Sequence, residues 1–227
     1  MKYKINLHAH TRYSDGANTL QEMVFAYKHM GYCAAVLTDH HYTGSPDLAN
    51  YSMNLDEYSS ACEKADKISK LLNYPVIVGC EWGFFRCEEV LCFGRSFITA
   101  LLSHTDVSIG KFKELKDTFG GACIVAHPIL SENKFIEMGG HKVVDGYEGY
   151  NGGGDMFNPD FRKLPPEFKD LRAYSNSDAH SINTLIDEGR RGDNYNLINE
   201  KIDDESKLLN YIRDRKPVKM VVQGEYA

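Results

Sequence analysis

The chain has 227 residues, 42% of them hydrophobic, which suits one domain with a sizeable core better than two small ones. Its formal net charge is −6, and no Lys/Arg cluster outweighs its acidic neighbours, so the electrostatic pattern of a duplex nucleic-acid binder is excluded. No apolar run approaches the roughly 20 residues that cross a bilayer, and the N-terminus leads into a strand instead of a signal peptide. We therefore expect a cytoplasmic protein without a membrane partner.

Hydrophobic periodicity predicts alternating strands and helices from the N-terminus onward. Thr19 precedes one helical pattern and Gly31 closes it, while Asp56 and Glu57 in the first turn of another pattern favour the helix dipole. In chain order the first third predicts a strand over 3–8, a helix over 20–30, a strand over 33–37, a helix over 55–72 and a strand over 75–80.

The rest of the chain continues in the same manner. It predicts strands over 90–93 and 97–102, a helix over 110–119, strands over 122–125, 142–147 and 171–174, a helix over 207–215 and a strand over 218–222. Repeated strand-then-helix units with short connections favour a parallel sheet, most economically a closed one.

Five polar fragments follow apolar runs, where the C-terminal ends of strands are expected. They are His8-Ala9-His10, Thr38-Asp39-His40-His41, Gly79-Cys80-Glu81-Trp82, Ala126-His127-Pro128 and Ser177-Asp178-Ala179-His180. The period of two in a strand puts His8 and His10 on one face, where two imidazoles can bind one metal ion. An unpaired buried carboxylate costs several kcal/mol, so Glu81 and Asp178 at strand ends indicate a cation. Barrel enzymes place their chemistry at such ends.

These fragments, in this order, resemble the PHP (polymerase and histidinol phosphatase) family of metal-dependent phosphoesterases. The resemblance runs from His8 to His180 and covers nearly the whole chain. It implies an α/β fold, a distorted TIM-like (β/α)7 barrel, in a single PHP domain spanning residues 1–227.

The resemblance also implies two or three divalent metal ions, zinc, manganese or iron. By matching motifs, the first ion would be shared by His8, His10, Glu81 and Asp178, the second would be held by His127 and a bridging Glu81, and the third by Asp15, His40 and His180.

The implied activity is phosphate-ester hydrolysis by a histidinol-phosphatase-like phosphomonoesterase acting on a small phosphorylated metabolite or nucleotide. A cluster of divalent ions lowers the pKa of a bridging water to give metal-bound hydroxide and neutralises the phosphoryl oxygens. No protein nucleophile is needed, and the sequence contains no Gly-x-Ser-x-Gly. We expect a small phosphorylated substrate and no duplex nucleic acid; the sequence does not indicate the oligomeric state.

Two further side chains are candidates for catalysis. Arg12, two residues past the histidine pair, is the first candidate for clamping a phosphate, followed by Arg190 and Arg191; for each, a solvated surface arginine is the alternative. His41 is a candidate for protonating the leaving oxygen, or for orienting a neighbouring ligand instead.

Cys92 marks a departure from the family pattern. Where the family often supplies a histidine to the second metal, this chain reads Val90-Leu91-Cys92-Phe93-Gly94. A thiolate there would suit zinc, whereas a buried thiol would pack in the core like a small apolar side chain.

Two other functions remain open at this point. A non-catalytic or regulatory metal-binding PHP module would be expected to have lost several ligands, whereas only one position is questionable here. An amidohydrolase-type hydrolase would also begin with His-x-His and carry a late aspartate, but the turn at Asp15 and the pair Asp178 and His180 fit the PHP pattern better.

Overall fold

The structure is a computed structural model that describes residues 2–43, 46–84, 88–128, 134–153, 166–186 and 194–222. Its strands are β1 (Tyr3–Ile5), β2 (Ala35–Leu37), β3 (His40–Tyr42), β4 (Val76–Val78), β5 (Cys80–Gly83), β6 (Glu89–Phe93), β7 (Ala122–Val125), β8 (Gly146–Asn151), β9 (Arg172–Asn176), β10 (Tyr195–Ile198) and β11 (Val218–Val221). Its α-helices are α1 (Leu20–His29), α2 (Leu55–Leu72), α3 (Arg95–Leu102), α4 (Ile109–Phe119), α5 (Lys134–Glu137), α6 (Ile182–Ile186) and α7 (Glu205–Arg213). Short 3-10 helices are η1 (Pro46–Tyr51), η2 (Gly140–Lys142) and η5 (Pro166–Phe168).

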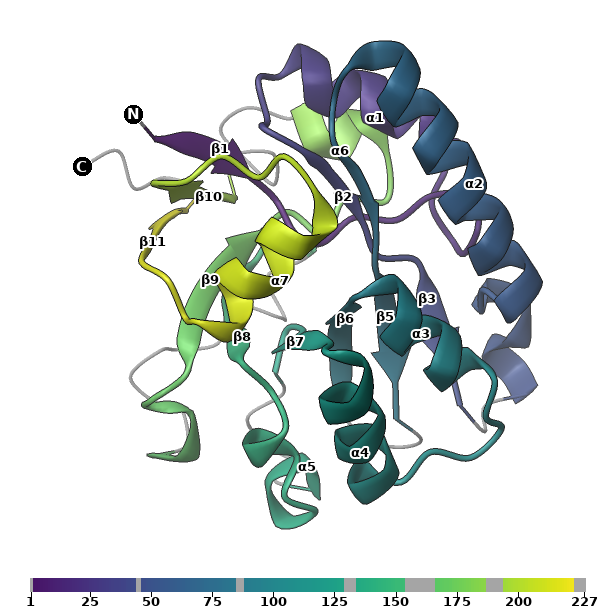
Figure 1. Ribbon diagram of the computed structural model, residues 1–227, viewed down its shortest axis with the longest axis vertical. Coiled ribbons are helices and arrows are strands. Elements are labelled where there is room, and N and C mark those ends of the chain that lie inside the picture. The colour runs from purple at the N-terminus through teal and green to yellow at the C-terminus, as the bar shows by residue number, and fades with distance from the viewer. Residues whose placement is uncertain are drawn as a thin grey trace.

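The largest sheet has the strand order β3-β5-β6-β7-β8-β9. Its neighbours pair in parallel, except that β6 runs antiparallel to both β5 and β7. Strands β2 and β4 form a parallel pair that continues along the chain into β3 and β5, and β1, β10 and β11 form a separate antiparallel sheet. In Figure 1, α1 and α2 lie along one side of these sheets, and α3 and α4 lie beside β5, β6 and β7.

The predicted α/β class is confirmed, but a closed TIM-like barrel is not, because the described strands form three separate sheets. Two isolated β-bridges join the N-terminal segment to neighbouring segments. One pairs Ala9 with Ala179 and the other pairs Lys4 with Tyr32, and neither extends into a continuous ladder. The antiparallel β6 also departs from a repeated strand-then-helix pattern, since no helix lies between β5 and β6 among the described residues.

Local signals account for the main helices. Thr19 and Glu22 form a capping box at the start of α1, and Asn54 and Glu57 form another at the start of α2. Free backbone N–H groups are therefore satisfied at the N-terminal end of each of these two helices. Helix α2 begins and ends where the sequence predicts. No helix among the described residues is long and apolar enough to cross a membrane.

The strand predicted over 97–102 is wrong, since these residues lie in α3. Phe97, Ile98 and Leu101 are fully buried, and their spacing is that of one helical face. A short apolar run does not distinguish a strand from a buried helix, which is why the sequence pattern misled. Part of the strand predicted over 142–147 is also replaced, because η2 ends at Lys142 and β8 begins only at Gly146.

Candidate metal centre

The centre begins with the segment that follows β1. The backbone N–H of His10 donates to the carbonyl of Ala179 (2.9 Å), and the N–H of Thr38 donates to the carbonyl of Ala9 (2.8 Å), so this segment lies between its two neighbours. His8 and His10 are fully buried, with their Nε2 atoms 3.0 Å apart. The two rings lie side by side, as predicted, but β1 ends at Ile5 and neither histidine lies within a strand, so the strand predicted over 3–8 is shorter than expected.

A buried aspartate positions the turn after the histidine pair. Asp39 accepts hydrogen bonds from the Thr11 backbone N–H (2.7 Å), the Thr11 hydroxyl (2.8 Å) and the Ser14 hydroxyl (2.8 Å). The turn closes with the Gly16 N–H donating to the Thr11 carbonyl (2.9 Å), and a Cβ at Gly16 would meet the His10 backbone at 2.7 Å. This close approach requires glycine, and it brings Asp15 to the site.

Glu81 stands at the middle of the centre. Strands β3 and β5 pair with His40 opposite Glu81, and the carboxylate is fully buried. One oxygen, Oε2, lies 3.0 Å from both His8 Nε2 and His40 Nδ1, while the other, Oε1, lies 3.0 Å from His127 Nε2. A carboxylate that faces histidines with both oxygens has the arrangement of a bridging ligand.

His127 and Asp178 have an uncommon backbone conformation. Their φ angles are +22° and +50°, in the positive region that non-glycine residues rarely adopt. Asp178 Oδ1 lies 3.1 Å from His10 Nε2 and 3.3 Å from His8 Nε2. Such backbone strain concentrates at functional sites, where the surrounding structure holds it.

The side chains form four overlapping groups that could each hold a metal ion. Within each group, the ligand atoms all lie within 4.8 Å of one another. The groups are His10, Asp15, His40 and His180; His8, Glu81 and His127; His8, His10 and Asp178; and His40, Glu81 and Glu89. The structure therefore brings together all eight side chains that the sequence predicts as metal ligands, and it adds Glu89.

Glu89 escaped the sequence analysis because of strand direction. It is the first residue of β6, and because β6 is antiparallel to its neighbours, its N-terminal end lies where their C-terminal ends lie. Its carboxylate oxygens lie 3.4 Å from His127 Nε2 and 3.7 Å from His40 Nδ1. The sequence feature that could have indicated Glu89 is a carboxylate at the start of the apolar run of β6, whereas the other predicted ligands were sought after such runs.

Glu148 was also missed, and it supports the centre from behind. This fully buried carboxylate on β8 accepts a hydrogen bond from His8 Nδ1 (2.9 Å), which leaves Nε2 of that ring to face the centre. It also accepts hydrogen bonds from Asn176, Asn151 and the backbone N–H of His127, at 2.7 to 2.8 Å. A carboxylate that fixes the tautomer of a histidine is the usual partner of a metal-binding imidazole.

The donor set fits divalent cations. Two imidazole nitrogens 3.0 Å apart cannot both donate to each other, but both can face one cation. The buried His10 Nδ1 has no hydrogen-bond partner among the described residues, although it lies in a group with Asp15 and His40. Imidazole and carboxylate together suit zinc, iron and manganese.

The protonation of the centre follows from its burial and charges. Burial and the neighbouring His40 lower the pKa of His10 to about 4. Burial also opposes the charged forms of His40 and His127, but the surrounding carboxylates, Glu81 foremost, together outweigh it and raise their pKa values to about 9 and about 10. Protonated histidines thus balance buried carboxylates, a role that a bound cation would take over.

The candidates for catalysis lie outside the four groups. His41 Nδ1 donates to the Met53 carbonyl (2.9 Å), and its ring stacks on Trp82 with centroids 4.6 Å apart, because neighbours along a strand point to opposite faces. The exposed Arg12 donates from Nε to the Ala17 carbonyl (2.8 Å). Arg190 and Arg191 lie outside the described residues.

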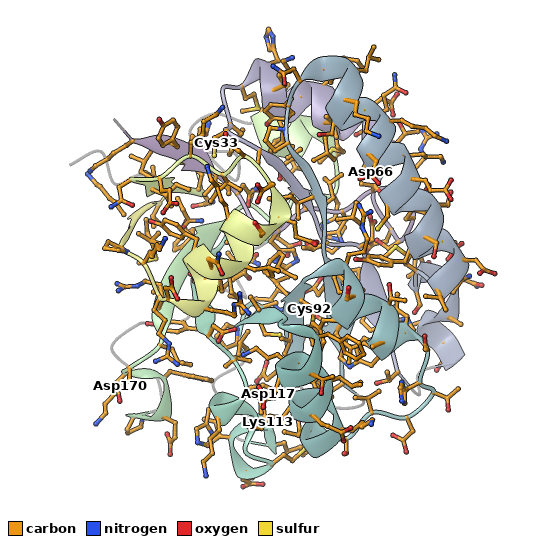
Figure 2. The ribbon with its side chains drawn as sticks, viewed as in Figure 1. Cys33, Asp66, Cys92, Lys113, Asp117 and Asp170 are labelled. Carbon is orange, nitrogen blue, oxygen red and sulfur yellow. The ribbon has the colours of Figure 1, made fainter. Side chains whose placement is uncertain are left out.

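Cys92 lies in the core. It is fully buried, and its thiol donates to the Val90 carbonyl (3.4 Å). Figure 2 labels its position. Its neighbours in register are Cys80 and Cys123. Within the described parts of the chain, none of the three belongs to a group that could hold a metal ion. Burial raises the pKa of this thiol well above its ordinary value, so the geometry favours a packed thiol over a zinc-binding thiolate.

Comparison with known families agrees with the centre. Residues 6–108 match the model of the PHP domain, an interval that contains His8, His10, Asp15, His40 and Glu81. Over this interval the chain is similar to the PHP domain family. The remaining ligand candidates, His127, Asp178 and His180, lie beyond the matched interval, and the fold brings them to the same centre. No curated protein matches the chain.

Three solved structures share the fold. A two-domain protein from Bacteroides vulgatus ATCC 8482 that contains a predicted PHP-like metal-dependent phosphoesterase is 14% identical, with a TM-score of 0.61 over 98% of this chain and 65% of that one. A protein from Bifidobacterium adolescentis ATCC 15703, assigned as a metal-dependent phosphoesterase, is 15% identical, with a TM-score of 0.51 over 93% and 96%. The lesion-specific endonuclease PfuEndoQ from Pyrococcus furiosus is 17% identical, with a TM-score of 0.68 over 97% and 58%. The chain thus spans less than two thirds of the first and third of these proteins.

Proposed function

We propose that this protein hydrolyses phosphate esters with the help of two or three divalent metal ions, and that its substrate is a small phosphomonoester, either a phosphorylated metabolite or a nucleotide. One observation carries the proposal: nine histidine and carboxylate side chains from six separate segments of the chain meet in overlapping groups with ligand-like spacing. A non-catalytic module would not need to keep so complete a set of ligands.

The groups suggest how the ions would be held. His8, His10, Glu81 and Asp178 would hold one ion. Glu81 would bridge to a second at His127 and Glu89, and Asp15, His40 and His180 would hold the third. When bound, such ions lower the pKa of a coordinated water and neutralise phosphoryl oxygens.

The protein supplies orientation in this scheme. Glu148 holds the proton of His8 on Nδ1, so that Nε2 presents its lone pair. Asp39 fixes the turn that carries Asp15. His41 as the acid for the leaving oxygen stays a prediction, and burial lowers its pKa, which keeps the ring neutral at neutral pH.

A substrate screen tests the proposal. Phosphorylated metabolites should be offered to zinc-, manganese- and iron-loaded protein beside a cyclic amide, and we expect phosphate release from a monoester and no amide hydrolysis. Asp178→Asn is the matched control, because it keeps the size of the side chain and removes its charge. Amide hydrolysis alone would assign the amidohydrolase chemistry, and the absence of both activities would support a non-catalytic module.

Phosphodiester cleavage is the second candidate, favoured by the structural similarity to PfuEndoQ. The net charge of −6 argues against it for duplex DNA, whose affinity normally depends on many Lys and Arg contacts. Tight duplex binding that weakens steeply with salt would reverse this preference.

A further inference from the structure

A separate cavity of about 500 Å³ lies beside the metal centre. Arg12 and Tyr13 line it from the turn after the histidine pair, and the start of α1 and the middle of α2 supply the other walls. The remaining lining residues are Thr19, Leu20, Gln21, Lys64, Lys67 and Ile68. No member of the four metal-binding groups lines this cavity, so it is distinct from the centre.

The cavity is basic in an otherwise acidic protein. Arg12, Lys64 and Lys67 line it. Among the residues that the structure describes, no carboxylate lines it and none forms an ion pair with these three side chains. Lys64 Nζ lies 5.0 Å from the centroid of the Tyr13 ring. Cations that converge on a concave surface without a carboxylate partner raise the local concentration of anions.

A nearby carboxylate does not neutralise these cations by pairing with them. Glu22 on α1 accepts hydrogen bonds from the backbone N–H and the hydroxyl of Thr19, both at 2.8 Å, as part of the helix cap. The cavity also contains apolar surface from Leu20 and Ile68, which suits the carbon skeleton of an organic anion.

The cavity lies close to the metal centre along the chain. Arg12 follows His10 by two residues, so their Cα atoms are at most about 7.6 Å apart, given 3.8 Å for each trans peptide. Tyr13 precedes Asp15 by the same number of residues. The backbone that carries the proposed ligands His10 and Asp15 therefore lies within about 8 Å of the backbone that lines the cavity.

We propose that this cavity binds a phosphate group other than the one hydrolysed at the metal centre. The inference rests on the proposed function only for the source of that phosphate: it is either a second phosphate of the substrate or a free phosphate ion. Cationic side chains recognise the same oxygens in both cases.

The first experiment measures binding without turnover. Inorganic phosphate is titrated calorimetrically into the metal-stripped full chain, so that bound metals do not contribute. We expect Lys64→Gln combined with Lys67→Gln to weaken binding about tenfold, as the loss of charge-assisted hydrogen bonds predicts. Replacing both residues by Arg should restore it, and Lys70→Gln, an exposed lysine of α2 outside the cavity, should leave it unchanged. Equal affinity for the wild type and the double Gln variant would overturn the proposal.

The second experiment distinguishes the two sources of phosphate. The metal-loaded enzyme is given alkanediol bisphosphates from ethanediol to hexanediol beside the matching monophosphates. If the substrate carries the second phosphate, the double Gln variant raises KM for the bisphosphate of best length about tenfold, with kcat and the monophosphate KM unchanged. If KM is unaffected while the calorimetric effect persists, free phosphate is the ligand. Failure of all turnover with the calorimetric effect intact would reject the proposed function and leave the phosphate pocket standing.

Discussion

Replacing Glu148 by Gln should lower the stability of the fold and the metal affinity of the centre, although none of the proposed ligands is replaced. The carboxylate accepts hydrogen bonds from four donors. Oε1 faces His8 Nδ1 (2.9 Å) and Asn176 Nδ2 (2.8 Å), and Oε2 faces the His127 backbone N–H (2.8 Å) and Asn151 Nδ2 (2.7 Å). The Gln side chain has one oxygen and one NH₂ group. Whichever way it is turned, the NH₂ group would face one of the two pairs of donors and could not accept their hydrogen bonds.

The surroundings prevent an easy rearrangement. The Asn176 oxygen already accepts from the Leu7 backbone N–H (2.9 Å) and the Asn151 oxygen from the Gly153 N–H (2.6 Å), so neither amide can rotate to offer an oxygen. Two hydrogen bonds to a charged acceptor are lost, at about 1.5–3 kcal/mol each, which gives a destabilisation of about 3–6 kcal/mol. Metal affinity should also fall by about 10–100-fold, as expected for a side chain that orients a ligand.

Urea unfolding followed by the fluorescence of Trp82, the single tryptophan, measures this effect. With a slope of about 3 kcal/mol per molar urea, the midpoint should fall by about 1 M or more. Glu63→Gln is the matched control, because Glu63 is exposed on α2, and its midpoint should stay near that of the wild type. A Glu148→Gln protein with wild-type midpoint and metal content would refute the role assigned to this carboxylate.

Three further outcomes are expected. Asp178→Ala should abolish turnover and remove metal from the purified protein, as measured by metal analysis; full activity would contradict its role. Glu89→Ala should lower metal content while Cys92→Ser leaves it unchanged, and the opposite result would make Cys92 the ligand. Because the pKa values of His40 and His127 are about 9 and about 10 without metal, both rings are protonated at pH 7 and must lose protons to bind metal. Metal added to weakly buffered protein should therefore release protons, and affinity should rise with pH toward about 9–10; an affinity that is independent of pH would speak against both ligands.

The sequence by itself determined the ligand candidates that follow parallel strands, together with the helices that carry their own caps. His8 and His10, two residues apart just after β1, lie side by side as the alternation of side chains along an extended segment predicts, and this is local geometry. Helix α2 has the predicted bounds because its capping box and its apolar spacing are both written within one segment. Such features do not depend on which other segments lie alongside.

Only the tertiary structure decided which other side chains reach the centre. Glu89 lies there because β6 runs antiparallel to its neighbours, and Glu148 because the β8 register places it behind His8. Cys92, three residues from Glu89, is packed in the core instead. Strand direction and register arise from pairing between distant segments, and reversing a strand exchanges the end that meets the site. The hydrophobic pattern within a strand is the same in both directions, so it does not record that choice.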